Sequence, residues 1–129
     1  MSDNKEITLL FHKSYEKLSV AEELHKNGHY EDAVSRSYYA LYYAAKALLS
    51  SKGIITKTHK GLITQISDHY VNTGLMDHQI WHTLAYAESL RESADYGTGE
   101  QITEEISLDV IEESKKFIQI CEILVSRQK

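Results

Sequence analysis

The chain has 129 residues, no proline, one cysteine and a net charge of −5, which suits a single globular domain that needs no disulfide framework. It contains no apolar run of the roughly 18 residues that a membrane-spanning helix requires, and its polar start, MSDNKEITLL, is unlike a signal peptide. A lone Cys121 also suits a reducing compartment. We therefore expect one domain over residues 1–129, no membrane partner and a cytoplasmic location.

The first half of the chain predicts two long helices. Residues 5–27 place apolar side chains on one broad side and charges on much of the rest, which is typical of an amphipathic surface helix. Residues 30–51 contain the densest apolar and aromatic run, AVSRSYYALYYAAKALL. Its buried side at helical spacing is predicted to be Val34, Tyr38, Leu41, Ala45 and Leu48. A helix this apolar should lie at the centre of the fold, with the other segments packed around it.

The second half predicts three further helices through their capping residues. Thr58, Asp77 and Thr103 each precede an apolar-periodic segment, and their side-chain oxygens can accept from free N–H groups of a first helical turn. The three helices should span about 59–74, 78–95 and 104–127, with a break at residues 96–99. The expected fold class is therefore all-α, a five-helix up-and-down bundle.

Charge is unevenly distributed along the chain. Residues 33–67 contain no acid but five cations, which leaves a net charge of −10 for the remainder. The cations are Arg36, Lys46, Lys52, Lys57 and Lys60. Either the basic centre pairs with acidic parts of the fold or a dimer, or it meets phosphate. For Arg36, within the apolar run, we expect a structural ion pair, with a cleft position as the alternative.

Two tyrosine pairs, Tyr38–Tyr39 and Tyr42–Tyr43, lie four residues apart in the central segment. At this spacing they stack on a helix, and a role in the core and in dimer contacts is the favoured interpretation. Base stacking on nucleic acid is the alternative. The seven histidines show no spacing that would supply three metal ligands, so we expect no metal and no cofactor.

Four stretches together resemble the small stand-alone HEPN proteins of prokaryotes: SRSYYALYYAAKALL, SKGIITKTHKGLI, LRESADYG and TEEISLDVIEESKKFI. The resemblance covers nearly all of residues 33–124. It implies an all-α bundle of the HEPN type, usually a homodimer, and a small nucleotidyltransferase as a frequent partner in a toxin–antitoxin-like pair. Some members of the family are metal-independent ribonucleases, whereas others are non-catalytic binding modules.

The catalytic motif of the family is an arginine followed a few residues later by a histidine. The matching segment here is Arg91-Glu92-Ser93-Ala94-Asp95-Tyr96, in which Arg91 is present and Asp95 or Tyr96 stands near the place of the histidine. A carboxylate and a phenol are poor substitutes for a histidine whose pKa lies near neutrality. Arg91 can still bind a phosphate, or it can pair with Glu88, Glu92 or Asp95 around the same helix end.

We therefore predict a degenerate HEPN-type homodimer that binds RNA or a nucleotide and works with a nucleotidyltransferase partner. The predicted ligand-binding residues are Arg91, Tyr96, Arg36, Lys57 and Lys60. One alternative is an active metal-independent ribonuclease toxin in which Arg91 is joined by Asp95, Tyr96 or a nearby histidine. The other is a structural partner subunit whose cleft binds nothing.

Overall fold

The computed structural model describes residues 4–97 and 101–128, and this part of the chain is helical, with no residue in a β-strand. The five α-helices are α1 (Asn4–Lys26), α2 (Tyr30–Ser50), α3 (His59–Ile66), α4 (His78–Tyr96) and α5 (Glu104–Arg127). The predicted all-α class is confirmed. Of the predicted break at residues 96–99, Tyr96 is the last residue of α4 and Gly97 is its C-cap, whereas residues 98 and 99 lie outside the described residues. No helix in the described ranges is both long enough and apolar enough to cross a membrane.

The three predicted capping residues begin the helices as expected. Oγ1 of Thr58 accepts from the N–H of Gly61 at 2.8 Å, and Oδ1 of Asp77 accepts from the N–H of Gln79 at 2.8 Å. Thr103 caps α5 in the same way. Each cap satisfies a backbone donor that has no partner inside the helix.

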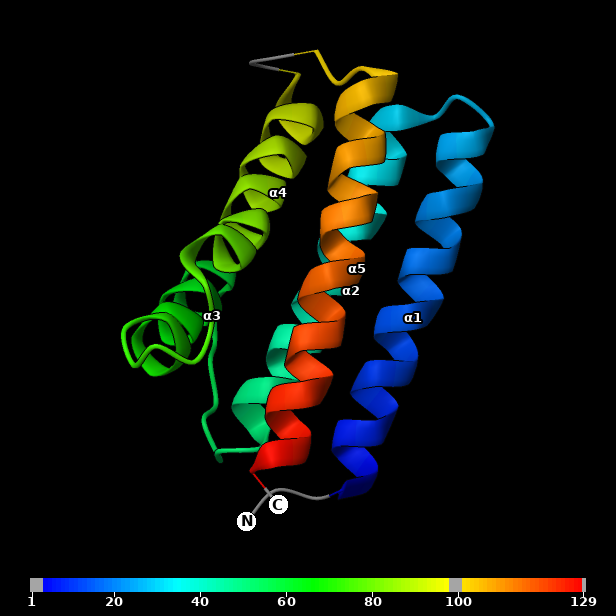
Figure 1. Cartoon of the computed structure of the whole chain (residues 1–129). Helices are drawn as coiled ribbons and strands as arrows, with labels where there is room; N and C mark the ends of the chain where they lie inside the picture. The colour runs from blue at the N-terminus through cyan, green and yellow to red at the C-terminus, as the bar shows by residue number, and fades with distance from the viewer. Residues whose placement is uncertain (1–3, 98–100, 129) are drawn as a thin grey trace.

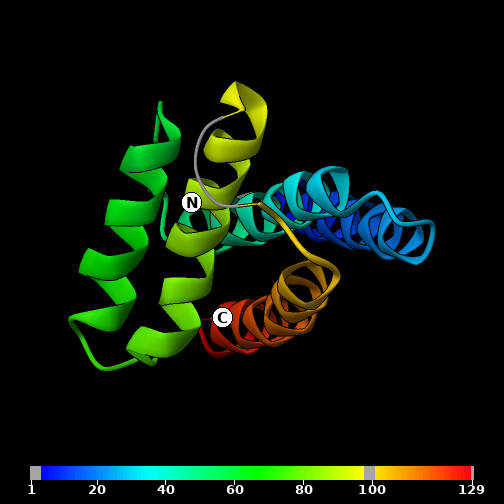
Figure 2. The same ribbon diagram turned by 90° about the horizontal axis from the view of Figure 1, so that it is seen from above.

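Helix α2 lies at the centre of the fold, as its composition predicts. It packs against α1, α5, α4 and α3 (Figure 1). The view along the bundle shows α1 beside α2, α5 below it, and α3 with α4 on the other side (Figure 2). Small side chains permit this close approach, since Ala40, Ala44 and Ala47 are completely buried.

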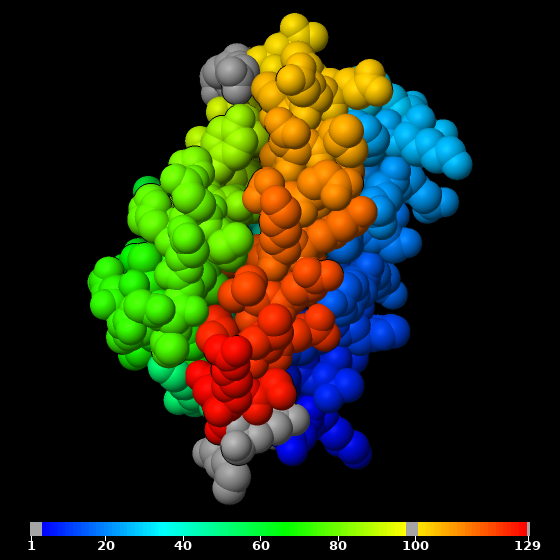
Figure 3. Space-filling model, in the orientation of Figure 1, coloured from blue at the N-terminus to red at the C-terminus, as the bar shows by residue number. Residues whose placement is uncertain are grey.

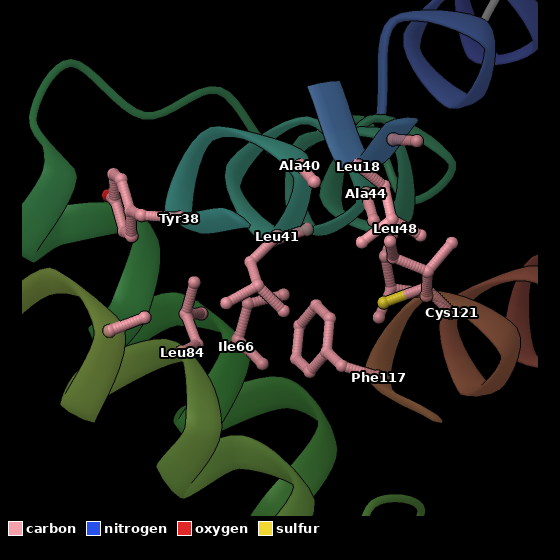
Figure 4. Close-up of a cluster of buried hydrophobic side chains, with 14 of the residues drawn as sticks. Leu18, Tyr38, Ala40, Leu41, Ala44, Leu48, Ile66, Leu84, Phe117 and Cys121 are labelled. Atoms are coloured by element: carbon pink, nitrogen blue, oxygen red, sulfur yellow. The ribbon is translucent and has the colours of Figure 1, made fainter. Parts of the chain in front are cut away.

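The core lies between α2 and its neighbours. The five residues of the predicted buried side, Val34, Tyr38, Leu41, Ala45 and Leu48, are all 0% exposed. Leu41 meets Ile66 of α3, Leu84 of α4 and Phe117 of α5 in one cluster (Figure 4). Figure 3 shows the side of the molecule that α5 covers. On this surface α5 runs between α4 and α1.

The third helix differs from its prediction in its second half. Ser67–Val71 forms a π-helix, η1, in which the N–H of Asn72 bonds to the carbonyl of Ser67 at 2.9 Å, five residues back. The wider turn accompanies complete burial of Tyr70, whose Oη donates to Gln128 Oε1 at 2.6 Å. The amide of Gln128 also donates to Ser51 Oγ, so one side chain ties the end of α5 to α2 and η1.

Candidate functional site

Arg91, in the second half of α4, is held by two carboxylates of its own helix. Its Nε and Nη2 donate to Glu88 Oε1 at 2.8 and 2.7 Å, and its Nη1 donates to Asp95 Oδ2 at 2.8 Å. The spacings of three and four residues bring all three side chains to one side of the helix. The Glu88 side chain is 9% exposed and that of Asp95 51%, so Glu88 is the buried partner and Asp95 the solvated one.

Arg91 keeps its positive charge in this setting. Burial by itself lowers the arginine pKa, but the hydrogen bond and the charge of Glu88 outweigh it, so the pKa of Arg91 is raised above its usual value. The guanidinium also lies over two rings of α2, 5.3 Å from the centroid of Tyr38 and 5.8 Å from that of Tyr39. These cation–π contacts fix the arginine between α4 and α2.

His59, the first residue of α3, joins the same group of side chains. Its Nδ1 lies 2.6 Å from Tyr38 Oη and 3.5 Å from Glu88 Oε2. Its ring stacks on Tyr42 with centroids 4.9 Å apart. Residues from α2, α3 and α4 therefore meet in one place, and we call Tyr38, His59, Glu88, Arg91 and Asp95 the Arg91 cluster.

Tyr38 orients the histidine. Burial, aided by the nearby charge of Glu88, raises the pKa of Tyr38 far above the usual value for a tyrosine. The phenol therefore keeps its proton and can donate it to His59 Nδ1. Since both contacts of His59 involve Nδ1 and 37% of its side chain is exposed, Nε2 is the ring atom left for a ligand.

An open groove of about 400 Å³ adjoins the cluster between α3 and α4. Its lining residues are Lys60, Ile63, Ala85, Glu88, Ser89, Glu92, Ser93 and Tyr96. Glu88 belongs to both the groove and the Arg91 cluster. Lys60 supplies a cation from α3, and Tyr96, which is 78% exposed, lies at the end of α4. Beside the fixed arginine, the groove thus carries one lysine, the carboxylates of Glu88 and Glu92, and one exposed aromatic ring.

The structure brings four of the six predicted site residues to this region. Arg91 and Asp95 are in direct contact, and Lys60 and Tyr96 line the groove. Lys57 is exposed in the loop before α3 and does not line it. Arg36 is exposed on the outer side of α2, and the ion pair predicted for it is wrong, since no carboxylate in residues 4–97 and 101–128 pairs with it. Solvent on that side removes the need for a partner.

His59 and Glu88 were not among the predicted site residues, and Tyr38 was predicted to lie in the core or a dimer contact, with base stacking as the alternative. Glu88 was named only as one possible partner of Arg91. No local spacing joins these three residues, since Tyr38 and His59 are 21 residues apart and belong to different helices. The closest available signal was the N-cap at Thr58, because it places the next residue, His59, at the start of a helix.

Neither a metal site nor a nucleophilic thiol is supported by the described residues. No group of three or more His, Cys, Asp and Glu side chains in residues 4–97 and 101–128 is placed to hold a metal ion. Cys121 is completely buried, and burial raises its thiol pKa well above the usual value. A neutral buried thiol is a poor nucleophile, so Cys121 serves as a core residue.

The fold and this site define a small helical-bundle domain with a polar cluster where its second, third and fourth helices meet. The HEPN domain family matches residues 7–124, and the chain belongs to that family. It is 37% identical over 114 residues to the protein named "Putative toxin MJ0605" of Methanocaldococcus jannaschii, covering 88% of this chain and 84% of that one. It is 30% identical over 124 residues to a UPF0332 protein of Archaeoglobus fulgidus, covering 96% and 98%. A UPF0332 protein of Thermotoga maritima is 31% identical over 117 residues, covering 91% and 89%.

Proposed function

We propose that this protein is a toxin-like HEPN module that binds RNA or a nucleotide at the Arg91 cluster and the adjoining groove. Family membership and the toxin name of the Methanocaldococcus jannaschii relative support the general role. The observation that carries the proposal is the geometry of Arg91. Its guanidinium is fixed by Glu88 and two tyrosine rings beside a groove that also holds Lys60 and Tyr96.

A phosphate would reach Arg91 by displacing Asp95. Glu88 occupies Nε and Nη2 and is buried, whereas Asp95 occupies only Nη1 and is half exposed. An exposed ion pair contributes at most about 1 kcal/mol, whereas a charge-assisted bond to a phosphate is short and strong. Asp95 therefore acts as a weak internal competitor for the ligand.

A homodimer fits this arrangement better than a single copy. One arginine with two carboxylates leaves the Arg91 cluster with a net negative charge when His59 is neutral. Two facing grooves would bring a second Arg91 within reach of the same phosphate, so that one ligand could pair with two guanidinium groups once the exposed Asp95 side chains are displaced. We propose that a nucleotidyltransferase partner, of the kind that HEPN relatives have, controls access to this composite site.

Titration of a fluorescently labelled single-stranded RNA and of a labelled nucleotide tests the proposal. Replacing Arg91 by Gln should weaken binding by about tenfold or more, since it removes a charge-assisted contact. Replacing Asp95 by Asn should strengthen it, because the competitor loses its charge. Arg127→Gln, at the end of α5, is the matched control and should bind as the parent does. Absence of RNA and nucleotide binding at low salt, or equal affinity of all four proteins, would overturn the proposal.

A second candidate is a metal-independent ribonuclease, and the position of His59 favours it. Cleavage through the 2′-hydroxyl needs a base, an acid and a cation that holds the phosphate. His59 can supply the proton transfers that the family motif assigns to its histidine, and Arg91 lies across Glu88 from it. Incubation with total RNA in the presence of a chelator tests this: the parent should cleave, and His59→Ala and Arg91→Gln should not. Binding without cleavage would support the binding module. The absence of both binding and cleavage would support a structural subunit.

A further inference from the structure

The outer side of α2 carries cations and tyrosines in a row. Arg36, Tyr39, Tyr43 and Lys46 are spaced by three or four residues, so on a helix they fall within one arc of less than a third of its circumference. Arg36 and Lys46 are exposed, and the two tyrosines are partly exposed. We call these four residues the outer stripe of α2.

No helix in the described residues runs across this stripe. Two cations from neighbouring helices lie against its rings: Arg91 of α4 lies over Tyr39, and Lys13 of α1 lies over Tyr43. Figure 2 shows α1 beside α2, α5 below it, and α3 with α4 on the other side, which leaves one side of α2 open. Residues next to the stripe continue its alternation of cations and rings. Lys46 Nζ lies 5.9 Å from the Tyr42 centroid, and Lys13 Nζ of α1 lies 5.6 Å from the Tyr43 centroid. Alternating cations and aromatic faces are what single-stranded nucleic acid binds.

After Asp32, helix α2 contributes only basic charges to this surface. No acid occurs from Ala33 to Ser67, and Asp32, one turn before Arg36, bounds the stripe at its start. At the other side the stripe reaches the Arg91 cluster, since the Arg91 guanidinium lies over Tyr39. The carboxylates of that cluster are bound to Arg91. The stripe is therefore a continuous path that attracts an anion toward the proposed site.

We propose that the outer stripe of α2 is a track for single-stranded RNA, with bases stacked on Tyr39 and Tyr43 and phosphates paired with Arg36 and Lys46. The proposal rests on the proposed function and specifies its ligand. Single strands fit better than a duplex, because only unpaired bases present their faces to an aromatic ring. A second copy of this chain fits poorly, because a two-fold axis would set two basic stripes against each other.

Binding of labelled oligouridine and oligoadenosine, each of about 12 nucleotides, to stripe variants tests the track. Tyr39→Ala and Tyr43→Ala should each weaken binding by about tenfold, whereas Tyr39→Phe and Tyr43→Phe should bind as the parent does. A duplex of the same length should compete poorly.

The exposed cations give a test that does not depend on the tyrosines' place in the fold. The double variant Arg36→Gln, Lys46→Gln should bind more weakly and lower the salt dependence, by about 1.4 in the slope of log affinity against log salt. The double variant Lys116→Gln, Arg127→Gln, on α5, also removes one lysine and one arginine. It is the charge-matched control and should change the slope little.

The outcomes separate the track from the proposed function. If Arg91→Gln weakens RNA binding but the stripe variants do not, the track is wrong and the proposed function stands. If the parent protein binds no RNA, both fail. Sedimentation velocity tests the other possible occupant of the stripe, a second copy of this chain. If the parent is a dimer and the Arg36→Gln, Lys46→Gln variant is a monomer, the stripe is an interface between copies and the track is overturned.

Discussion

Replacing Arg91 by Leu should destabilise the fold, because it leaves the buried carboxylate of Glu88 without its ion-pair partner. The Glu88 side chain is 9% exposed and that of Arg91 16%. Removing one partner of a fully buried ion pair costs about 3 to 5 kcal/mol. The slight exposure of both groups places the expected cost near the lower end, at about 3 kcal/mol. The bond to the half-exposed Asp95 adds little.

A double variant separates the lost pair from lost packing. Arg91→Leu, Glu88→Leu removes both charges, and replacing both partners of a buried pair by apolar groups is often close to neutral. The double variant should therefore recover more than half of the loss, although His59 also loses a nearby carboxylate.

Denaturant unfolding followed by circular dichroism measures both variants. Arg91→Leu should unfold about 3 kcal/mol more easily than the parent, which for a chain of this length corresponds to a drop in melting temperature of about 10 °C. If the double variant is no more stable than Arg91→Leu, Glu88 is not a stranded charge and the reasoning about its burial is refuted.

Three further changes probe the fold. The pKa of Tyr70 is raised to about 12, chiefly by burial, so between pH 10 and 12 the unfolded chain loses this proton first and stability falls as pH rises. Tyr70→Phe should flatten that fall by about 2 kcal/mol in unfolding titrations across this range, and an unchanged slope would contradict it. Phe117→Ala empties a fully buried ring site and should cost about 3 to 5 kcal/mol in denaturant unfolding, with Phe117→Leu losing much less; equal losses would argue against a cavity. Thr103→Ala should cost about 1 kcal/mol and Thr103→Ser far less, since Ser keeps the capping oxygen; equal melting temperatures for the two would show that the cap contributes nothing.

Helix positions were predictable because their signals are local. The buried side of α2 follows from apolar spacing alone, and the caps at Thr58, Asp77 and Thr103 each need only residues that are adjacent in sequence. The π-helix at Ser67–Val71 was not predictable, because what accompanies it is the distant tie of Tyr70 to Gln128.

The candidate site likewise has one part that the sequence could predict and another part that it could not. The contact of Arg91 with Asp95 spans four residues on one helix, so the sequence could propose it. The meeting of Tyr38, His59 and Glu88 depends on how α2, α3 and α4 pack, which no spacing encodes. The predicted pairing of Arg36 was wrong for a related reason: an apolar neighbourhood in sequence does not reveal which side of a central helix stays open.

The most direct test of the Arg91 site uses the chain's three arginines, Arg36, Arg91 and Arg127. Their Nε–H signals can be followed by NMR while a single-stranded RNA is added at low salt. The account predicts that the Arg91 signal shifts, with the Arg36 signal moving beside it along the proposed track, while that of Arg127 stays in place. An Arg91 signal that does not move, or that moves no more than that of Arg127, would contradict the assignment of RNA to this site.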